Sequence, residues 1–548
     1  MTSTEDGGPV RHTEDITESG HPWLRMTGRA VRSTVTYAAV LAAVFVSAVV
    51  GVGLPLVFFG LVAAVGFFAL AWTYPKVALG LTLVIAAISG QIQAALGSVG
   101  GIADEAMIFG AAAIIVARRA IVERSLVWLP GSGWFAVFVF AGSLGAILYG
   151  TPVAISLQGA TLLTKCIVFA VAVAQLHWRP ADLHALARAG FGLAIVLIAT
   201  GVVNLAIPGP WTGLFGGSAV QYYGGIPAII GPFQQPAAYG RMATILASSI
   251  LAYQLFVKSS WFGYLVALML TGLALLTFRA KALVGLMVVT TGLVLRKGNV
   301  LVLAVAAAAL PAALILLGPS IYVAVFGDLQ LYYGAGQLSA RSRLTAGGWQ
   351  IASNYFPLGV GFGRYGSATA ADYYSPEYTK LGFDGIYGIG SGPEMGKYLN
   401  DTQWPALLGE TGWLGTVAFV IGALLALRIL LIRVSPDEPA IVRWIRFSGV
   451  CWFTLIMLDS VAAPAFTSPP SYLFLFAASA IAASLRTDVR NGTLDFAPSA
   501  MPVNLGPPPI TRRLSPAIPA GAFLRPNAAL AATHPHEGTL QLQMKEAP

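Results

Sequence analysis

The sequence predicts an all-α, polytopic integral membrane protein with about 12–14 transmembrane helices and one long structured extracytoplasmic loop. Of its 548 residues, 56% are hydrophobic and only 10% are charged, and the mean hydropathy is +0.74. A soluble protein carries about 25% charged residues. Most of the apolar stretches run for about 16 to 23 residues without strict alternation, close to the ~20 that a membrane helix requires. Barrel strands would be about ten residues long with alternating polarity, so we expect helices.

Fourteen stretches of the chain are candidate spans. They cover residues 34–51, 54–72, 77–95, 105–117, 133–149, 153–175, 187–207, 235–256, 261–278, 280–295, 299–317, 405–428, 447–464 and 470–485. Cys166 and Cys451 fall inside two of them, and we expect buried core thiols rather than a disulfide.

The distribution of Lys and Arg predicts the orientation. If the N-terminal segment 1–33 is cytoplasmic, the inner connections collect most Arg and Lys residues, and the short outer connections hold almost none. The first eleven spans then fill 34–317, the extracytoplasmic loop 318–404, the last three spans 405–485, and a disordered cytoplasmic tail 486–548. We therefore expect a multi-pass protein of the cell membrane with both termini in the cytoplasm. The net charge of +9 lies mostly beside the spans, which argues against a nucleic-acid partner.

The loop is rich in Tyr, Gly and Phe, so we expect it to be ordered. Its tyrosines either stack on sugar rings or pack a small core within the loop. They are Tyr332, Tyr333, Tyr355, Tyr365, Tyr373, Tyr374 and Tyr378.

A set of charged residues is not explained by orientation. The cations are Lys165, Arg241, Arg279, Lys281, Arg341, Arg343 and Arg364, and the acids are Asp104, Glu105, Glu410 and Asp459. A charge at membrane depth costs at least ~2.5 kcal/mol, so it usually faces a cavity or a partner. Several cations converging on one outer cavity would bind a phosphorylated or anionic substrate. Alternatively, Arg279 and Lys281 extend to the interface, Arg241 pairs with Glu410 or Asp459, and nothing binds.

The remaining chemical inventory predicts neither a metal nor a cofactor. All six histidines lie in predicted cytoplasmic segments, and the sequence has no metal-binding spacing and no phosphate-binding loop of the nucleotide-hydrolase type. An outer-face enzyme without nucleotide needs a pre-activated substrate. A sugar on a polyprenyl diphosphate fits, because its lipid lies in the bilayer and its diphosphate binds cations.

Three sequence segments carry a family resemblance. Arg341-Ser342-Arg343 and Trp349 precede a Phe-Pro-Leu-Gly-Val-Gly-Phe-Gly turn at 356–363, and Leu-Leu-Gly-Glu-Thr-Gly-Trp-Leu-Gly at 407–415 opens the next span. This order resembles the outer loop of the bacterial O-antigen ligase and polymerase family. The turn that ends in Arg279 and the run Gly-Pro-Phe-Gln-Gln-Pro at 231–236 are also similar, so the likeness covers about 230–425.

The resemblance implies metal-independent, inverting transfer of a glycan from a polyprenyl-diphosphate donor to a hydroxyl of a glycan or lipid acceptor on the outer face. Arg279 and Arg241 would bind the diphosphate, assisted by Arg341 or Arg343, and Lys281 and Arg364 would also contact the substrate. The family usually has a histidine before the Glu-x-Gly helix, whereas this chain has Asn-Asp-Thr-Gln-Trp at 400–404. Asp401 or Glu410 would therefore take the acceptor proton.

Two other functions are compatible with the sequence. A transporter or flippase of lipid-linked or anionic substrates would show symmetric halves with broken helices, and we find no such symmetry. A non-catalytic scaffold for envelope polysaccharide synthesis is consistent with the missing histidine. The sequence identifies neither the glycan nor the acceptor, and it does not separate a ligase from a polymerase.

Overall fold

The computed structural model describes residues 55–96, 103–215, 219–279 and 339–496 except 393, and the single residues 101, 285, 289, 290 and 292. The predicted spans 34–51 and 299–317, most of 280–295, the segments 1–33 and 318–338, Lys281, Tyr332, Tyr333 and the tail from 497 lie outside the described residues.

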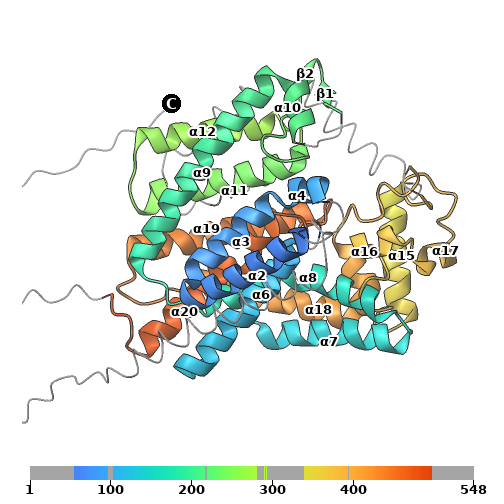
Figure 1. The fold of residues 1–548 in the computed structure, drawn as a ribbon, viewed down its shortest axis with the longest axis horizontal. Coiled ribbons are helices and arrows are strands. Elements are labelled where there is room, and N and C mark those ends of the chain that lie inside the picture. Colours follow the sequence, from blue (N-terminus) through green and yellow to red (C-terminus); the bar gives the residue numbers. More distant parts are fainter. Residues whose placement is uncertain are drawn as a thin grey trace, which may run out of the picture. The chain divides into compact units, whose positions relative to one another are not determined.

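The described part of the chain is mostly helical (Figure 1). Its α-helices are α2 (Pro55–Thr73), α3 (Pro75–Ala87), α4 (Ser89–Leu96), α6 (Ala103–Arg118), α7 (Ser132–Leu148), α8 (Val153–Ala174), α9 (Pro180–Ala206), α10 (Pro208–Leu214), α11 (Pro236–Phe256), α12 (Trp261–Leu275), α15 (Ala340–Asn354), α16 (Ala368–Asp372), α17 (Pro376–Lys380), α18 (Trp404–Leu431), α19 (Ala440–Ser460) and α20 (Phe474–Arg490). A π-helical turn (Arg119–Glu123), a 3₁₀ turn (Ser471–Leu473) and one antiparallel pair, β1 (Tyr222–Tyr223) with β2 (Ile226–Pro227), complete the elements.

Among the described residues, five helices are long and apolar enough to cross a membrane, by length and composition. They are α8, α9, α18, α19 and the helical stretch Ser471–Arg490. Shorter apolar helices include α7 and α12. The predicted α-helical, membrane-type character of the chain is therefore supported.

Three helix boundaries differ from the sequence prediction for a physical reason. Helix α9 begins at Pro180 rather than 187, because the Arg179 N–H donates to the Asp182 carboxylate and closes a polar first turn. Helix α19 begins at Ala440 rather than 447, since it includes Arg443 and the buried Arg446, which binds Glu438 (2.7 Å). The predicted span 77–95 is two helices, α3 and α4, and Gln91 beyond the break donates to the Pro232 carbonyl. Hydropathy alone does not detect polar helical turns.

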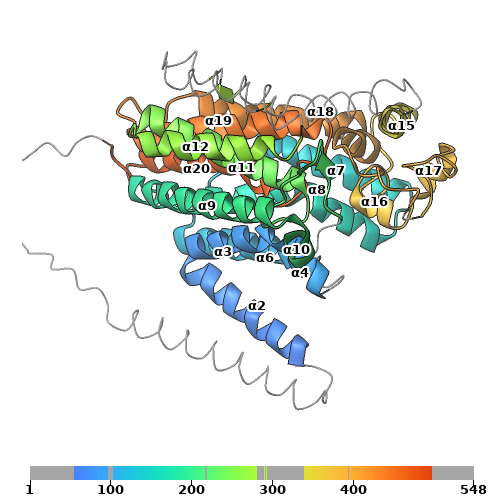
Figure 2. The ribbon, with the colours of Figure 1, turned by 90° about the horizontal axis from the view of Figure 1, so that it is seen from above.

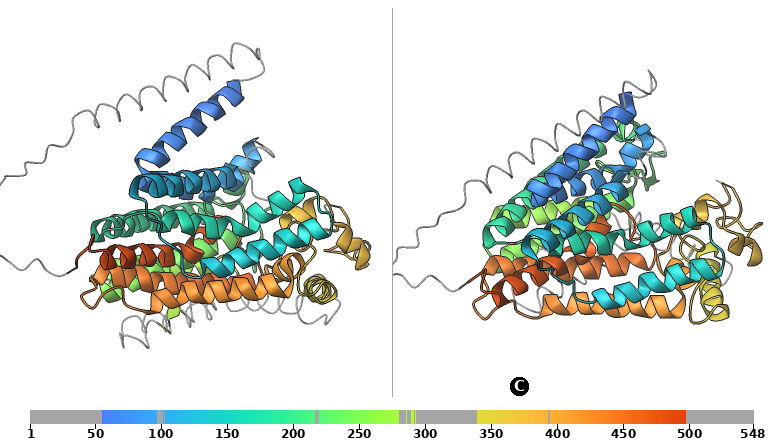
Figure 3. Two further views of the ribbon diagram at one scale, coloured as in Figure 1. Left: turned by 90° about the horizontal axis from the view of Figure 1, so that it is seen from below. Right: turned by 60° about the horizontal axis from the view of Figure 1, so that its bottom comes forward.

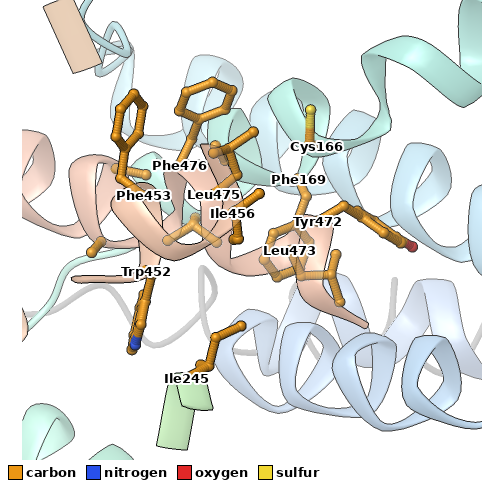
Figure 4. Close-up of a cluster of buried hydrophobic side chains, with 14 of the residues drawn as sticks. Cys166, Phe169, Ile245, Trp452, Phe453, Ile456, Tyr472, Leu473, Leu475 and Phe476 are labelled. Atoms are coloured by element: carbon orange, nitrogen blue, oxygen red, sulfur yellow. The ribbon is translucent and has the colours of Figure 1, made fainter. Parts of the chain in front are cut away.

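The long helices pack on one another through a continuous apolar core. Helices α7 and α18 run side by side (Figure 3), and α11 packs on α12 and α19. The core includes Phe169, Trp452 and Phe476 (Figure 4). Both cysteines, Cys166 and Cys451, are buried and unbridged, as predicted.

Polar contacts join helix ends that the sequence assigns to the same side. At predicted inner ends, Lys76 binds Asp182 (2.7 Å) and His177 Nε2 lies 2.8 Å from Glu123. At predicted outer ends, Arg364 donates to the Tyr149 carbonyl (2.8 Å). These are the contacts expected of helices that alternate in direction. The loop helices α15, α16 and α17 lie together at the outer-assigned end (Figures 1 and 2).

Candidate functional site

The two glycine-rich segments of the resemblance are in direct backbone contact. The Val360 N–H donates to the Gly409 carbonyl (2.9 Å), and the Leu414 N–H donates to the Pro357 carbonyl (3.0 Å). Gly412 has φ +63°, and a Cβ there would lie 2.2 Å from the Leu358 carbonyl carbon. Glycine is required at this contact, because a side chain would both strain the backbone and separate the segments.

Glu410 stabilises this contact between the two glycine-rich segments, which we call the junction. Its side chain is fully buried, and its Oε1 accepts hydrogen bonds from the Ser367 hydroxyl (2.5 Å) and the Tyr365 N–H (3.2 Å). The carboxylate thus holds the loop on the start of α18. This geometry favours a positioning role, and the assignment of Glu410 as a base stays a prediction.

Several loop tyrosines pack a core within the loop. Tyr365 and Tyr378 are fully buried in a cluster with Leu344 and Phe383. The Tyr365 hydroxyl donates to the Leu344 carbonyl (2.7 Å), and the Tyr378 hydroxyl accepts from the Gly366 N–H (2.9 Å). Burial raises the pKa of Tyr378 well above its usual value. Of the two predicted roles for the tyrosines, core packing is the one these two residues have.

The three arginines of the loop do not join a common cavity. Arg341 forms an ion pair with Asp401, and Arg364 forms one with Glu377 (2.6 Å). Arg343 is half-buried on α15. Within the described ranges these three arginines line neither of the two cavities below.

Arg241 and Arg279 do come together. Arg241 on α11, Arg279 after α12 and Asp459 on α19 line a cavity of about 20 Å³, the small cavity. Arg241 Nε lies 3.3 Å from Asp459 Oδ2, so this acid, not Glu410, is its partner. Arg279 donates to Gln221 Oε1 (2.8 Å), and its buried Nε has no hydrogen-bond partner among the described residues. The small cavity combines two guanidinium groups with one carboxylate.

A second cavity of about 850 Å³, the large cavity, lies between the outer-assigned ends of α6 and α8 and the loop. Its charged cluster has Lys165 and Asp104 buried and Glu105 half-buried: Lys165 Nζ is 3.2 Å from Asp104 Oδ2 and 2.7 Å from Glu105 Oε1. The Tyr472 hydroxyl donates to Asp104 (2.8 Å). The sequence singled out Lys165, Asp104 and Glu105 as charges in need of a partner, without assigning them a site, and they are one another's partners.

Three further lining residues were missed by sequence reasoning. The Thr369 and Thr402 side chains are buried, at 3% and 5% exposure, and neither hydroxyl has a hydrogen-bond partner within the described part of the chain. Asp372, at the end of α16, lines the same cavity; its side chain is exposed, and desolvation by the surrounding protein raises the pKa of its carboxyl. The sequence did not mark these three residues as cavity-lining, because their positions depend on how the loop folds back onto α8.

The described segments hold no group of three or more His, Cys, Asp or Glu residues placed to bind a metal ion. No model of a known protein family matches the chain, and no curated protein matches it either.

Proposed function

We propose that this chain is a membrane glycosyltransferase of the O-antigen ligase or polymerase type. It transfers a glycan from a polyprenyl-diphosphate donor to an acceptor hydroxyl at the outer face of the cell membrane. The observation that carries the proposal is the small cavity, where Arg241 of α11 and Arg279, which follows α12, lie together beside apolar helices. Guanidinium groups bind phosphate oxygens in bidentate geometry, and neighbouring apolar helices suit a polyprenyl chain.

The donor diphosphate would exchange with a carboxylate already present. A cavity of about 20 Å³ admits about one water molecule, so a diphosphate enters only when Arg241 releases Asp459. The Nε of Arg279 is a donor that the described protein groups leave unused. Both arginines then face an anion in place of Asp459.

The reaction is a displacement at the anomeric carbon. The acceptor oxygen bonds to that carbon, the bond from the carbon to the diphosphate oxygen breaks, and the electron pair leaves with the polyprenyl diphosphate. Arginine donors stabilise the negative charge that develops on this leaving group. The hydroxyl proton passes to a carboxylate. Asp401 forms an ion pair with Arg341, so it accepts the proton only when Arg341 releases it.

The test is turnover of a purified polyprenyl-diphosphate glycan by the protein in liposomes. We expect Arg279→Gln to lower turnover about 10²- to 10³-fold, the usual effect of removing one charge-stabilising donor. Lys397→Gln is the matched control, because Lys397 forms an exposed ion pair with Glu394 on the loop surface. Equal turnover by both variants would contradict the proposal.

One observation favours a transporter as the second candidate. Lys165 lies on α8, a helix long enough to cross a membrane, and it pairs there with two acids of α6. A buried charged cluster of this kind is typical of a site that couples transport to ion movement. A transporter would move the donor across the bilayer with its glycosidic bond intact. Release of free polyprenyl diphosphate therefore separates the two functions.

A further inference from the structure

We infer that the large cavity is a separate acceptor site, which binds an uncharged or amino sugar and not the donor diphosphate. This inference rests on the proposed function, and it assigns the two substrates to two different cavities.

The charge of the large cavity excludes a diphosphate. Its described lining holds three carboxylates, Asp104, Glu105 and Asp372, against one ammonium group, Lys165. Lys165 already binds two of the three acids, so it is not available to an incoming anion. Hydroxyl and ammonium groups of a sugar, in contrast, donate to carboxylates.

The other lining groups suit a sugar. Gln93, Gln158 and Asn400 present amides, each with both donors and acceptors, and Phe109 and Leu157 present apolar surface. A ring of hydroxyls around a carbon skeleton needs both kinds of contact. The volume of about 850 Å³ falls within the roughly 300–1,000 Å³ of small-molecule sites.

Two buried hydroxyls give an independent indication of a ligand. Thr369 lies in α16 and Thr402 just before α18, and both line the cavity with more than nine-tenths of their surface buried. Buried hydroxyls are normally hydrogen-bonded, whereas these two have no partner among the described residues. Both oxygens are closed to water-sized molecules, so rotation of each side chain about its Cα–Cβ bond would turn the hydroxyl into the cavity, where an acceptor sugar would supply the missing partner.

The two cavities are also neighbours. Arg241 of the small cavity donates to the Ser471 hydroxyl (3.2 Å), and the next residue, Tyr472, donates to Asp104 of the large cavity (2.8 Å). Consecutive residues of one turn therefore contact both sites. Transfer requires the acceptor oxygen to reach the anomeric carbon beside the diphosphate, and this arrangement places the two substrates next to each other.

The experiment measures binding of methyl glycosides by saturation-transfer NMR, with the full-length protein in lipid nanodiscs. The probes are methyl glucoside, methyl galactoside, methyl rhamnoside and methyl glucosaminide, with inorganic pyrophosphate as competitor. We expect at least one glycoside to bind the wild type. The double variant Thr369→Val, Thr402→Val should weaken that binding at least tenfold, and pyrophosphate should not displace the sugar.

The control is Thr200→Val, because the Thr200 hydroxyl donates to carbonyls of its own helix α9. Valine matches threonine in shape, so a merely structural role predicts unchanged sugar binding and an unfolding temperature at least as high as the wild type. Failure of every glycoside to bind, wild-type binding by the double variant, or displacement by pyrophosphate would each overturn the inference. The binding experiment contains no donor, so its failure contradicts only the acceptor site. Failure of donor turnover in liposomes, in contrast, contradicts the proposed function.

Discussion

The two cavities at the outer-assigned end of the helices differ in charge and in size. The small cavity holds two guanidinium groups and one carboxylate in about 20 Å³, whereas the large cavity holds three carboxylates and one ammonium group in about 850 Å³. One Ser-Tyr pair, Ser471 and Tyr472, contacts both. Neighbouring sites of opposite charge suit a reaction whose two substrates differ in the same way, a diphosphate and a polyhydroxylated acceptor.

The largest expected effect concerns the charged cluster of the large cavity. Lys165→Met leaves Asp104 and Glu105 without their cation, and breaking such a buried pair costs about 3–5 kcal/mol in unfolding free energy. Lys76→Met, which removes an exposed pair with Asp182, should cost at most about 1 kcal/mol. Denaturation of both variants in detergent measures the difference. Equal losses would show that the cluster is not built into the fold.

The next effect concerns the junction that positions the loop over the large cavity. Gly412→Ala should destabilise the fold by about 2–4 kcal/mol, since it adds left-handed backbone strain to a steric conflict with Leu358. Gly382 has a similar φ of +68° but open space around it. Gly382→Ala should therefore cost only about 1–2 kcal/mol for the backbone conformation. If the two variants unfold alike, the backbone contact between the glycine segments is unimportant.

A smaller effect distinguishes the candidate bases. Asp372→Asn should lower glycan transfer about 100-fold, because Asp372 lines the large cavity where we place the acceptor. Asp401→Asn should lower it less, because Asp401 is bound to Arg341. Desolvation by the surrounding protein raises the pKa of Asp372, and a base acts only when deprotonated, so transfer should fall as the pH drops through that raised pKa. This fall in transfer at low pH should be absent from Asp372→Asn. If the variant still shows it, another group is the base.

The smallest effect concerns the small cavity. Asp459→Asn removes the carboxylate that occupies Arg241, so pyrophosphate should bind about 3- to 10-fold more tightly, because more of the protein is ready to bind an anion. Asp437→Asn, in the exposed connection between α18 and α19, is the control. Isothermal titration of the reconstituted protein measures both affinities. Weaker binding by Asp459→Asn would mean that Asp459 orients Arg241 instead of blocking it.

Much of the described fold follows from hydropathy. The predicted spans 54–72, 133–149, 153–175 and 235–256 agree with α2, α7, α8 and α11 to within a residue or so at each end. The early starts of α9 and α19 were not predicted, because α9 has a polar, capped first turn and α19 carries Arg443 and Arg446 in its first two turns. Hydropathy locates the apolar part of a helix, and the helix itself extends beyond that part.

The candidate site was predictable only in part. Arg241 and Arg279 belong to the set of unexplained charges, and they share a cavity as the convergence interpretation expected. Arg341 and Arg364 belong to the same set, yet they bind loop carboxylates, whose proximity depends on the folded loop. Asp372 was not identified at all, since an acid in a long polar loop carries no mark of the cavity it lines.

The most direct test of the account is the fate of the donor in liposomes that contain the wild-type protein and an acceptor glycan. We expect release of free polyprenyl diphosphate together with an elongated or ligated glycan whose new linkage has the opposite anomeric configuration. Donor recovered intact on the opposite side of the bilayer, with no polyprenyl diphosphate released, would contradict glycosyl transfer and establish transport instead.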